Sequence, residues 1–152
     1  MKIPPILIEL EFDQKLLDAI AEMKKLYTED PIPWIVGYSG GKDSTAVVQC
    51  VFYMLKELKD EGKQLHKDIH VICTDTLVEN PIVSMWVESS LKIMQEAADA
   101  ENYPIQVHLL HPDPKDSFWA NLIGRGYPAP RNKFRWCTER MKIDPVTQFV
   151  EE

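Results

Sequence analysis

The stretch WIVGYSGGKDS, residues 34–44, decides the fold of this chain. Its first five residues are a short apolar run that predicts a buried β-strand, and residues 45–55 have the apolar content of a helix. The glycine-rich part, SGGKDS, therefore lies at a strand-to-helix turn. At such a turn, backbone N–H groups and the positive end of a helix dipole point at one place, which favours an anionic ligand.

The residue types in this turn favour a ligand that carries phosphate. Adjacent glycines let the backbone approach a ligand without Cβ clashes, the serines add hydroxyl groups, and Lys42 adds a mobile positive charge. The pattern is neither a Walker A loop nor the dinucleotide fingerprint, because the glycine spacing differs from both. A plain glycine turn with solvated charges is the alternative, and it leaves the clustering unexplained. The predicted phosphate-binding residues are Ser39, Gly40, Gly41, Lys42, Asp43 and Ser44.

Strands and helices alternate along the rest of the sequence. The predicted strands are residues 34–38, 69–73 and 105–110, and the predicted helices are residues 12–29, 45–61, 80–101 and 116–122. We expect Asp13, Asn80 and Asp116 to cap the helices that they open, and residues 124–133 to form a loop. This alternation predicts an α/β fold with a parallel sheet sandwiched by helices. In such folds ligands bind at the carboxyl ends of the strands, where the glycine loop falls.

Composition narrows the class of protein. A chain of 152 residues with 45% hydrophobic and 27% charged residues is long enough for one globular domain with a core. We expect no membrane association, because no stretch approaches the roughly 20 apolar residues of a membrane span and the start lacks the apolar region of a signal peptide. Three widely spaced cysteines argue against a disulfide framework and for the cytoplasm.

The charge is acidic overall but uneven. A net charge of −7 argues against general nucleic-acid binding. A local basic face on an acidic body suits one specific polyanion instead. That face comprises Arg125, Arg131, Lys133, Arg135, Arg140 and Lys142, with Glu139 as the only acid among them.

A second motif, TDTLVENP (residues 74–81), follows the second predicted strand. Asp75 stands at the strand's carboxyl end, so its carboxylate is a candidate for binding Mg²⁺ or a ribose hydroxyl, and Glu79 is close enough to share the crevice. The alternative is that Asp75 and Thr76 only shape the turn. His111, after the third strand, is a weaker candidate for lining the same crevice.

In a third motif, FRWCTERMK (residues 134–142), Trp136 and Arg140 would share one face if the motif forms a helix. Cys137 lies between basic residues, which favour a thiolate, so it is a candidate reactive or metal-bound cysteine; the alternative is a small buried thiol. Cys50 and Cys73 are expected in the core. Trp136 belongs to the basic motif, whereas the other tryptophans are expected to be buried.

The end of the sequence is unusual. Asp144-Pro145 is a good helix start, yet only residues 146–152 follow it, which predicts a domain cut from something longer. The alternative is a short terminal helix packed on the sheet. We divide the chain into an N-terminal helical segment, residues 1–33, and a nucleotide-binding domain, residues 34–152, truncated at its C-terminus.

These three motifs, in this order, resemble the phosphoadenosine phosphosulfate reductase branch of the PP-loop ATP pyrophosphatase superfamily. The resemblance covers residues 34–145, and within that branch it is closest to the DndC family of DNA phosphorothioation sulfurtransferases, with the SspD family also similar. The strings that carry it are PWIVGYSGGKDST, TDTLVENP and FRWCTERMK. The resemblance implies a Rossmann-like fold of the adenine nucleotide alpha hydrolase type.

The resemblance also implies a chemistry. ATP would be cleaved to AMP and pyrophosphate, which activates a DNA backbone phosphate for sulfur insertion, with Mg²⁺ as a cofactor. A cysteine desulfurase would donate the sulfur as a persulfide, and other phosphorothioation subunits would be partners. The loop residues 39–44 would hold the pyrophosphate, with Lys42, Asp43 and Cys137 as catalytic candidates. Asp75, Arg135 and Lys142 would contact the nucleotide or the transferred group.

Members of the DndC family resemble iron–sulfur proteins and contain further cysteines. Here Cys137 is the one residue matching such a site, so a 4Fe–4S cluster is expected only in a longer parent protein. Reductases of this branch use paired cysteines, whereas Trp136 precedes Cys137 in this sequence. Two alternatives to a sulfurtransferase therefore stay open. The first is a reductase-like enzyme acting on a sulfonucleotide, and the second is a non-catalytic nucleotide-binding part of a larger complex.

Overall fold

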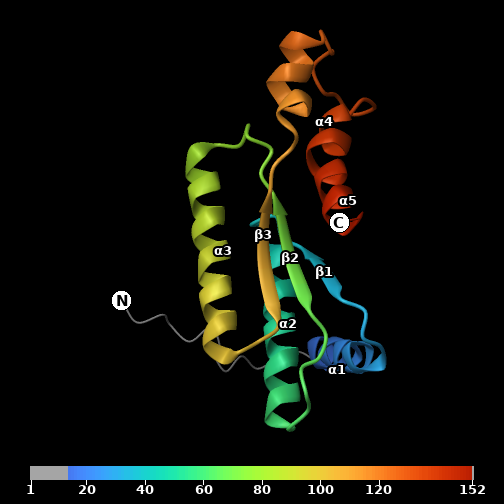
Figure 1. Ribbon diagram of the computed structural model, residues 1–152, viewed down its shortest axis with the longest axis vertical. Coiled ribbons are helices and arrows are strands. Elements are labelled where there is room, and N and C mark those ends of the chain that lie inside the picture. Colours follow the sequence, from blue (N-terminus) through green and yellow to red (C-terminus); the bar gives the residue numbers. More distant parts are fainter. Residues whose placement is uncertain (1–13, 152) are drawn as a thin grey trace.

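The computed structural model describes residues 14–151 and is built on a parallel sheet of three strands (Figure 1). The strand order is β1 (Trp34–Gly37), β2 (Ile69–Thr74) and β3 (Ile105–Leu110). The register pairs Trp34 with Ile69, and Ile69 with Ile105, so the three strands start level. The prediction of an α/β fold with a parallel sheet and flanking helices is confirmed.

Three long helices accompany this sheet: α1 (Gln14–Glu29), α2 (Lys42–Asp60) and α3 (Pro81–Glu101). In Figure 1, α3 runs beside β3 and α2 crosses behind the sheet. Buried side chains from all three helices and all three strands form one cluster, so α1 shares its core with the sheet. The predicted Phe12 start and Asp13 cap of the first helix lie outside the described residues.

The start of α3 is as predicted. The Asn80 side chain accepts a hydrogen bond from the Ile82 backbone N–H at 2.9 Å, and Pro81 occupies the first turn, where its missing N–H costs nothing.

Further along α3, Gln95 covers the open edge of β3. Its side-chain amide donates to the Ile105 carbonyl at 3.2 Å, and its amide oxygen accepts from the Val107 N–H at 2.9 Å. These bonds occupy edge groups that would otherwise pair with another strand.

A buried lysine joins α1 to the sheet. The Lys67 side chain is fully buried, and its ammonium group contacts Asp30 at 2.9 Å and the Leu26 carbonyl at 3.0 Å. The Tyr27 hydroxyl donates to the Lys67 carbonyl at 2.8 Å. A buried charge needs such partners to offset its desolvation, so this contact fixes where α1 ends.

The predicted helix over residues 116–122 is wrong in its start and its type. A 3-10 turn, η1 (Pro114–Asp116), comes first and is capped by Asp113, and a π-type turn, η2 (Ala120–Gly124), follows it. Asp116 is not a cap, because its carboxylate is occupied by Arg125 and Arg140, each at 2.7 Å. These two arginines lie 9 and 24 residues from Asp116 in the sequence, so the residues next to Asp116 could not indicate these bonds.

The predicted helix start at Asp144 coincides with the first residue of α5 (Asp144–Glu151), but this helix continues directly from the turn before it. One helical path runs through α4 (Trp136–Thr138), the π-type turn η3 (Glu139–Ile143) and α5 (Asp144–Glu151). Asp144 already has helical angles, with φ −57° and ψ −46°. The wider turn falls directly before Pro145, which has no N–H to donate.

The predicted alternative for this region, a terminal helix packed on the sheet, agrees with the described residues. The Phe149 ring of α5 lies 4.5 Å from the ring of His108 and 5.8 Å from that of His70, measured between centroids. Across residues 14–151 we find no helix with the length and apolar character needed to cross a bilayer.

Candidate functional site

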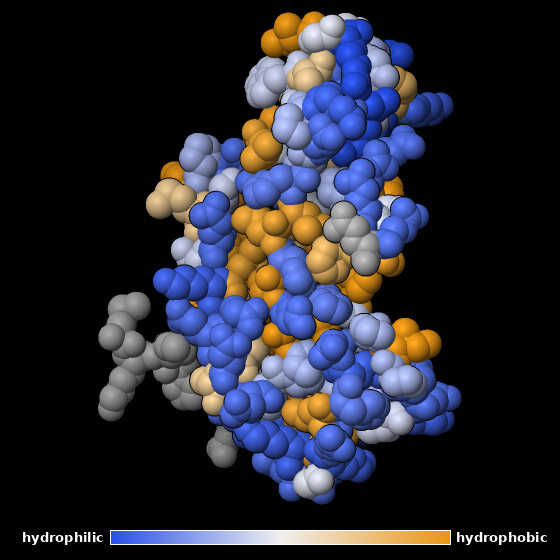
Figure 2. Space-filling view, in the orientation of Figure 1, coloured by the Kyte–Doolittle hydropathy of each residue, from blue (hydrophilic) through white to orange (hydrophobic). Residues whose placement is uncertain are grey.

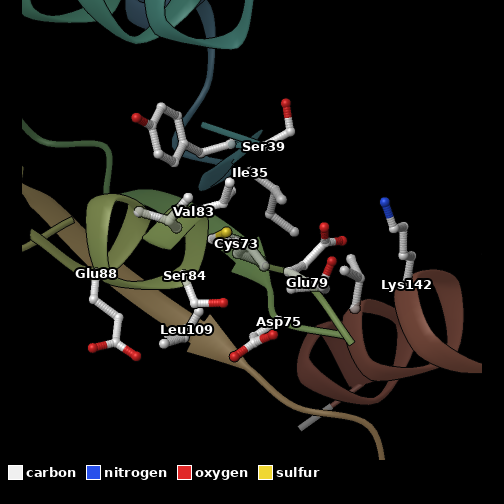
Figure 3. Close-up of a pocket in the computed structure, with 16 residues that line it drawn as sticks. Ile35, Ser39, Cys73, Asp75, Glu79, Val83, Ser84, Glu88, Leu109 and Lys142 are labelled. Atoms are coloured by element: carbon white, nitrogen blue, oxygen red, sulfur yellow. The ribbon is translucent and has the colours of Figure 1, made fainter. Parts of the chain in front are cut away.

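A cavity of about 340 Å³ opens at the carboxyl ends of the strands (Figure 3). The end of β1 contributes Gly37, Tyr38 and Ser39, and β2 with its following turn contributes residues 72–75 and Glu79. Val83, Ser84, Val87 and Glu88 of α3 form another wall, and Lys142 of η3 and Val146 of α5 close the far side. All three sequence motifs therefore contribute to one cavity, which the sequence placed at this edge of the sheet.

The glycine loop presents an uncapped helix end beside the cavity. Gly41 is the N-cap of α2, and no side chain caps the first turn of this helix. The Ser44 hydroxyl instead donates to the Gly41 carbonyl at 3.0 Å, and it accepts from the Ser39 N–H at 3.2 Å. The loop is thus held by its own serines, while the N–H groups of the first helical turn remain available for an anion.

Gly40 is required by its backbone and by its neighbours. Its φ is +73°, in the left-handed region that favours glycine. A Cβ placed there would lie 2.7 Å from Val87 Cγ2 and 3.0 Å from Trp86 Cζ3, so α3 packs directly on the loop. The sequence interpretation assigned the glycines to close approach by a ligand, and at Gly40 the close approach comes from α3.

Asp75 and Glu79 bring two carboxylates to the cavity. Asp75 Oδ1 accepts from the Leu77 N–H at 2.8 Å, and Leu77 is held at φ 60°, a strained conformation for a residue with a side chain. The buried Thr76 hydroxyl donates to Glu79 Oε1 at 3.2 Å. Asp75 therefore shapes the turn, as the alternative interpretation held, and its carboxylate also borders the cavity.

Cys73 and Lys142 face this acidic pair. Cys73 is buried as predicted, but it also borders the cavity, which the sequence interpretation missed. Burial is the main cause that raises the pKa of its thiol, the Asp75 carboxylate raises it further, and Lys142 opposes both. Figure 3 shows Glu79 lying between Cys73 and Lys142. The position of Cys73, two residues before the strand-end aspartate, was the available signal.

Other predicted site residues lie outside the lining of this cavity. Lys42 and Asp43 are exposed in the first turn of α2, next to the loop. Arg135 is exposed and precedes α4, and Cys137 is half-buried on α4. His111 is exposed and does not line the cavity.

A cluster of aromatic and charged side chains anchors the third motif. The Trp136 indole donates to the Pro128 carbonyl at 3.0 Å, and its ring stacks on Phe118 at 5.4 Å between centroids. Arg140 donates to Asp116 and, at 3.1 Å, to the Tyr127 hydroxyl. Hydrogen bonds from Arg125, and then those from Arg140, lower the pKa of the Asp116 carboxyl. The buried Trp136 reverses our expectation, since Trp86 and Trp119 are the more exposed tryptophans.

The donor set fits one implied cofactor and not the other. Two carboxylates beside a glycine loop suit Mg²⁺, which is commonly held by one or two carboxylates together with substrate phosphates. A 4Fe–4S cluster takes four thiolates, and this chain has three cysteines. In the part of the chain that the structure describes, no three His, Cys, Asp or Glu side chains gather as a metal site.

Comparison with known proteins finds a distant relative of this chain. No family model matches the chain. The chain is 30% identical over 135 residues to an uncharacterized protein of Methanocaldococcus jannaschii, MJ0066. That match covers 89% of this chain and 23% of the relative, so this chain spans less than a quarter of the relative's length. The function of this chain therefore has to be inferred from the residues of the site.

Proposed function

We propose that this chain is an ATP-pyrophosphatase-type domain of a sulfurtransferase that acts in DNA backbone phosphorothioation. One observation carries the proposal. Ser39 of the SGGKDS loop, Asp75 and Glu79 of the second motif, and Lys142 of the third motif line a single cavity, and the uncapped end of α2 follows that loop. Motifs far apart in the sequence that meet at one cavity are better explained by a shared ligand than by separate structural roles.

Each of these groups has a distinct role in the proposed reaction. The first turn of α2 receives the pyrophosphate part of ATP, and Lys42, with its flexible stem, reaches the charge that builds on the leaving group. Lys142 supplies positive charge from the opposite wall. Asp75 and Glu79 would hold Mg²⁺, which would supply positive charge against the phosphates. Val83 and Val87 give that side of the cavity an apolar wall.

The test is a product assay with Mg-ATP. We expect pyrophosphate and AMP, detected with a pyrophosphatase-coupled assay and by chromatography. Lys42→Ala and Lys142→Ala are each expected to lower the rate by about 100-fold or more, as expected when a preorganised charge-stabilising group is lost. Lys56→Ala is the matched control, because Lys56 is exposed on α2 away from the loop and its removal changes charge alone. Release of single phosphate from the γ position would refute the proposal.

A binding measurement separates the alternatives. Titration calorimetry with Mg-ATP and with phosphoadenosine phosphosulfate, repeated on Lys42→Ala, shows which nucleotide the loop prefers. A preference for the sulfonucleotide, with sulfite formed from it in the presence of a thiol, would favour the reductase-like enzyme instead. ATP binding that depends on Lys42 without any turnover, in the presence of DNA and a persulfide donor, would favour a non-catalytic nucleotide-binding domain.

A further inference from the structure

Residues 131–135, Arg-Asn-Lys-Phe-Arg, form a compact exposed turn that we call the basic tip. The Arg131 N–H donates to the Phe134 carbonyl at 3.1 Å, and the Phe134 N–H donates to the Arg131 carbonyl at 2.7 Å. This pair of bonds closes a tight turn and fixes the two ends opposite each other. All five residues are exposed, so the turn presents its side chains to solvent in a set arrangement.

The cations of this tip are unpaired, unlike the neighbouring Arg125 and Arg140. The guanidinium groups of Arg125 and Arg140 both form ion pairs with Asp116. Within residues 14–151, no ion pair or side-chain hydrogen bond involves Arg131, Lys133 or Arg135. Three unpaired positive charges within five residues, on a chain with a net charge of −7, form a local site of attraction for a polyanion.

An exposed aromatic ring lies among these charges. Phe134 is 40% exposed, and no other ring of the described residues stacks on it. Leaving a phenyl ring in water is unfavourable, and a base of a single strand offers it a flat partner, with nearby arginines for the phosphates. Bases in a duplex are already stacked and do not offer that face. Alternating cations and an aromatic ring therefore fit a single strand better than a duplex or an acidic peptide.

A short helical path joins the tip to the cavity. Arg135 directly precedes the helical path that begins at Trp136, and Lys142, seven residues later, lines the cavity. At a rise of about 1.5 Å per residue this is roughly 10 Å along the helix, less than the reach of a few nucleotides. Figure 1 shows this path running from α4, below the uppermost helical turn, down toward the sheet, and Figure 2 shows mostly hydrophilic residues around its upper end.

We propose that residues 131–135 are a docking surface for single-stranded DNA, in which Arg131, Lys133 and Arg135 bind phosphates and Phe134 stacks on a base. The choice of DNA as the nucleic acid rests on the proposed function. The binding itself needs no ATP, so it can fail or succeed independently of pyrophosphate release.

The experiment is fluorescence anisotropy of a labelled thymidine oligonucleotide, without nucleotide or metal, across a series of salt concentrations. Three phosphate contacts on a single strand predict a slope of log affinity against log salt of about −2. Changing Arg131, Lys133 and Arg135 together to alanine is expected to abolish this binding. The matched control changes Lys25, Lys56 and Lys92 to alanine, which removes the same charge from exposed helical positions elsewhere and should leave affinity nearly unchanged.

Phe134→Ala tests the stacking part separately. We expect single-strand affinity to fall by roughly 5- to 150-fold, the range expected for loss of one base–aromatic stack, while the salt slope stays the same. Phe134→Leu keeps an apolar side chain without the aromatic face and should behave like the alanine variant. Because these side chains are exposed, thermal unfolding of all variants should match that of the unmodified chain.

Three results would overturn the proposal. Equal losses in the tip and control triple variants would show that only total charge matters. Duplex DNA bound as tightly as the single strand, with no effect of Phe134→Ala, would remove the stacking role. Polyglutamate that competes as well as the oligonucleotide at equal charge would assign the tip to an acidic protein segment.

Discussion

Gly40→Ala provides the sharpest test of how the glycine loop is built. The substitution places a side chain at φ +73°, which costs roughly 1–2 kcal/mol for a residue with a Cβ. The new atom also meets Val87 Cγ2 at 2.7 Å and Trp86 Cζ3 at 3.0 Å, and overpacking of this kind typically costs about 1–3 kcal/mol. Together they predict a loss of about 2–5 kcal/mol in the free energy of unfolding. For a chain of this length that corresponds to a fall in Tm of roughly 5–20 °C.

The neighbouring glycine is the control. Gly41 has φ −82° and ψ 165°, an extended conformation open to alanine, and the nearest atom to its added Cβ is Ser39 Oγ at 3.4 Å. Gly41→Ala should therefore cost less than about 1 kcal/mol. If that residue faces the phosphates, the same substitution weakens ATP binding without lowering Tm. The two glycines are thus predicted to separate a packing requirement from a binding requirement.

The assay is thermal and urea unfolding followed by circular dichroism, with a double-mutant cycle. Val87→Ala removes Cγ2, so the Gly40→Ala/Val87→Ala double variant should recover about 1 kcal/mol relative to the sum of the single changes. The strain from the positive φ remains in every Gly40→Ala variant. Equal destabilisation by Gly40→Ala and Gly41→Ala, or strict additivity in the cycle, would refute the contact between α3 and the loop as its cause.

Three further predictions concern titratable groups. Burial, and then His70, lower the pKa of His108 below its ordinary value of 6.5, so the unfolded chain binds more protons and the stability of the fold should decrease as the pH drops through that value. Between about pH 7.5 and 5.5, Tm should therefore decline less in His108→Gln than in the unmodified chain, and an equal decline would contradict this. Because burial and Asp75 raise the pKa of the Cys73 thiol, iodoacetamide should alkylate Cys73 more slowly than the half-buried Cys137, and Asp75→Asn should speed the reaction at Cys73. Peptide mass spectrometry follows both rates, and faster labelling of Cys73 than of Cys137 would rule out the geometry of the cavity wall. Asp116→Ala leaves Arg125 and Arg140 without their carboxylate partner and should lower the free energy of unfolding by about 1–2 kcal/mol, after allowance for their partial exposure. Glu96→Ala, whose partner Lys92 is 3.9 Å away, should lower it by under about 0.5 kcal/mol, and equal effects in urea unfolding would count against a positioning role for Asp116.

Local patterns in the sequence were enough for the sheet and its long helices. Short apolar runs between long periodic segments gave the three strands to within a residue or two, and Asn80-Pro81 marked a helix start because both residues act on their nearest neighbours. The carboxyl-end rule for parallel strands then placed the loop and Asp75 at the same edge of the sheet. These inferences succeed because each depends on physics that operates within a few residues.

The sequence could not predict what depends on distant partners. Asp116 has the residue type of a helix cap, but a carboxylate bonded to two guanidiniums is more stable than one that caps a single N–H group, and neither arginine is near it in sequence. The contact between His70 and His108, whose ring nitrogens lie 3.1 Å apart, follows from the register of β2 and β3, which pairs His70 with Gln106 and places His108 two residues further along the same face. Trp86 is exposed over the glycine loop for a similar reason, since the packing of α3 decides which of its faces is covered.

The third motif shows why a continuous sequence string is not itself a site. The residues of this motif lie on different faces of the helix. Trp136 and Arg140 contact Tyr127, and neither lines the cavity. Lys142 and Val146, four residues apart, share the opposite face and line the cavity, and Phe149 continues that face onto the sheet. The motif therefore has two parts, an anchoring face and a cavity face, joined by the π-type turn before Pro145. A substitution on the anchoring face should act through the position of Lys142, and one at Lys142 should act on the ligand directly.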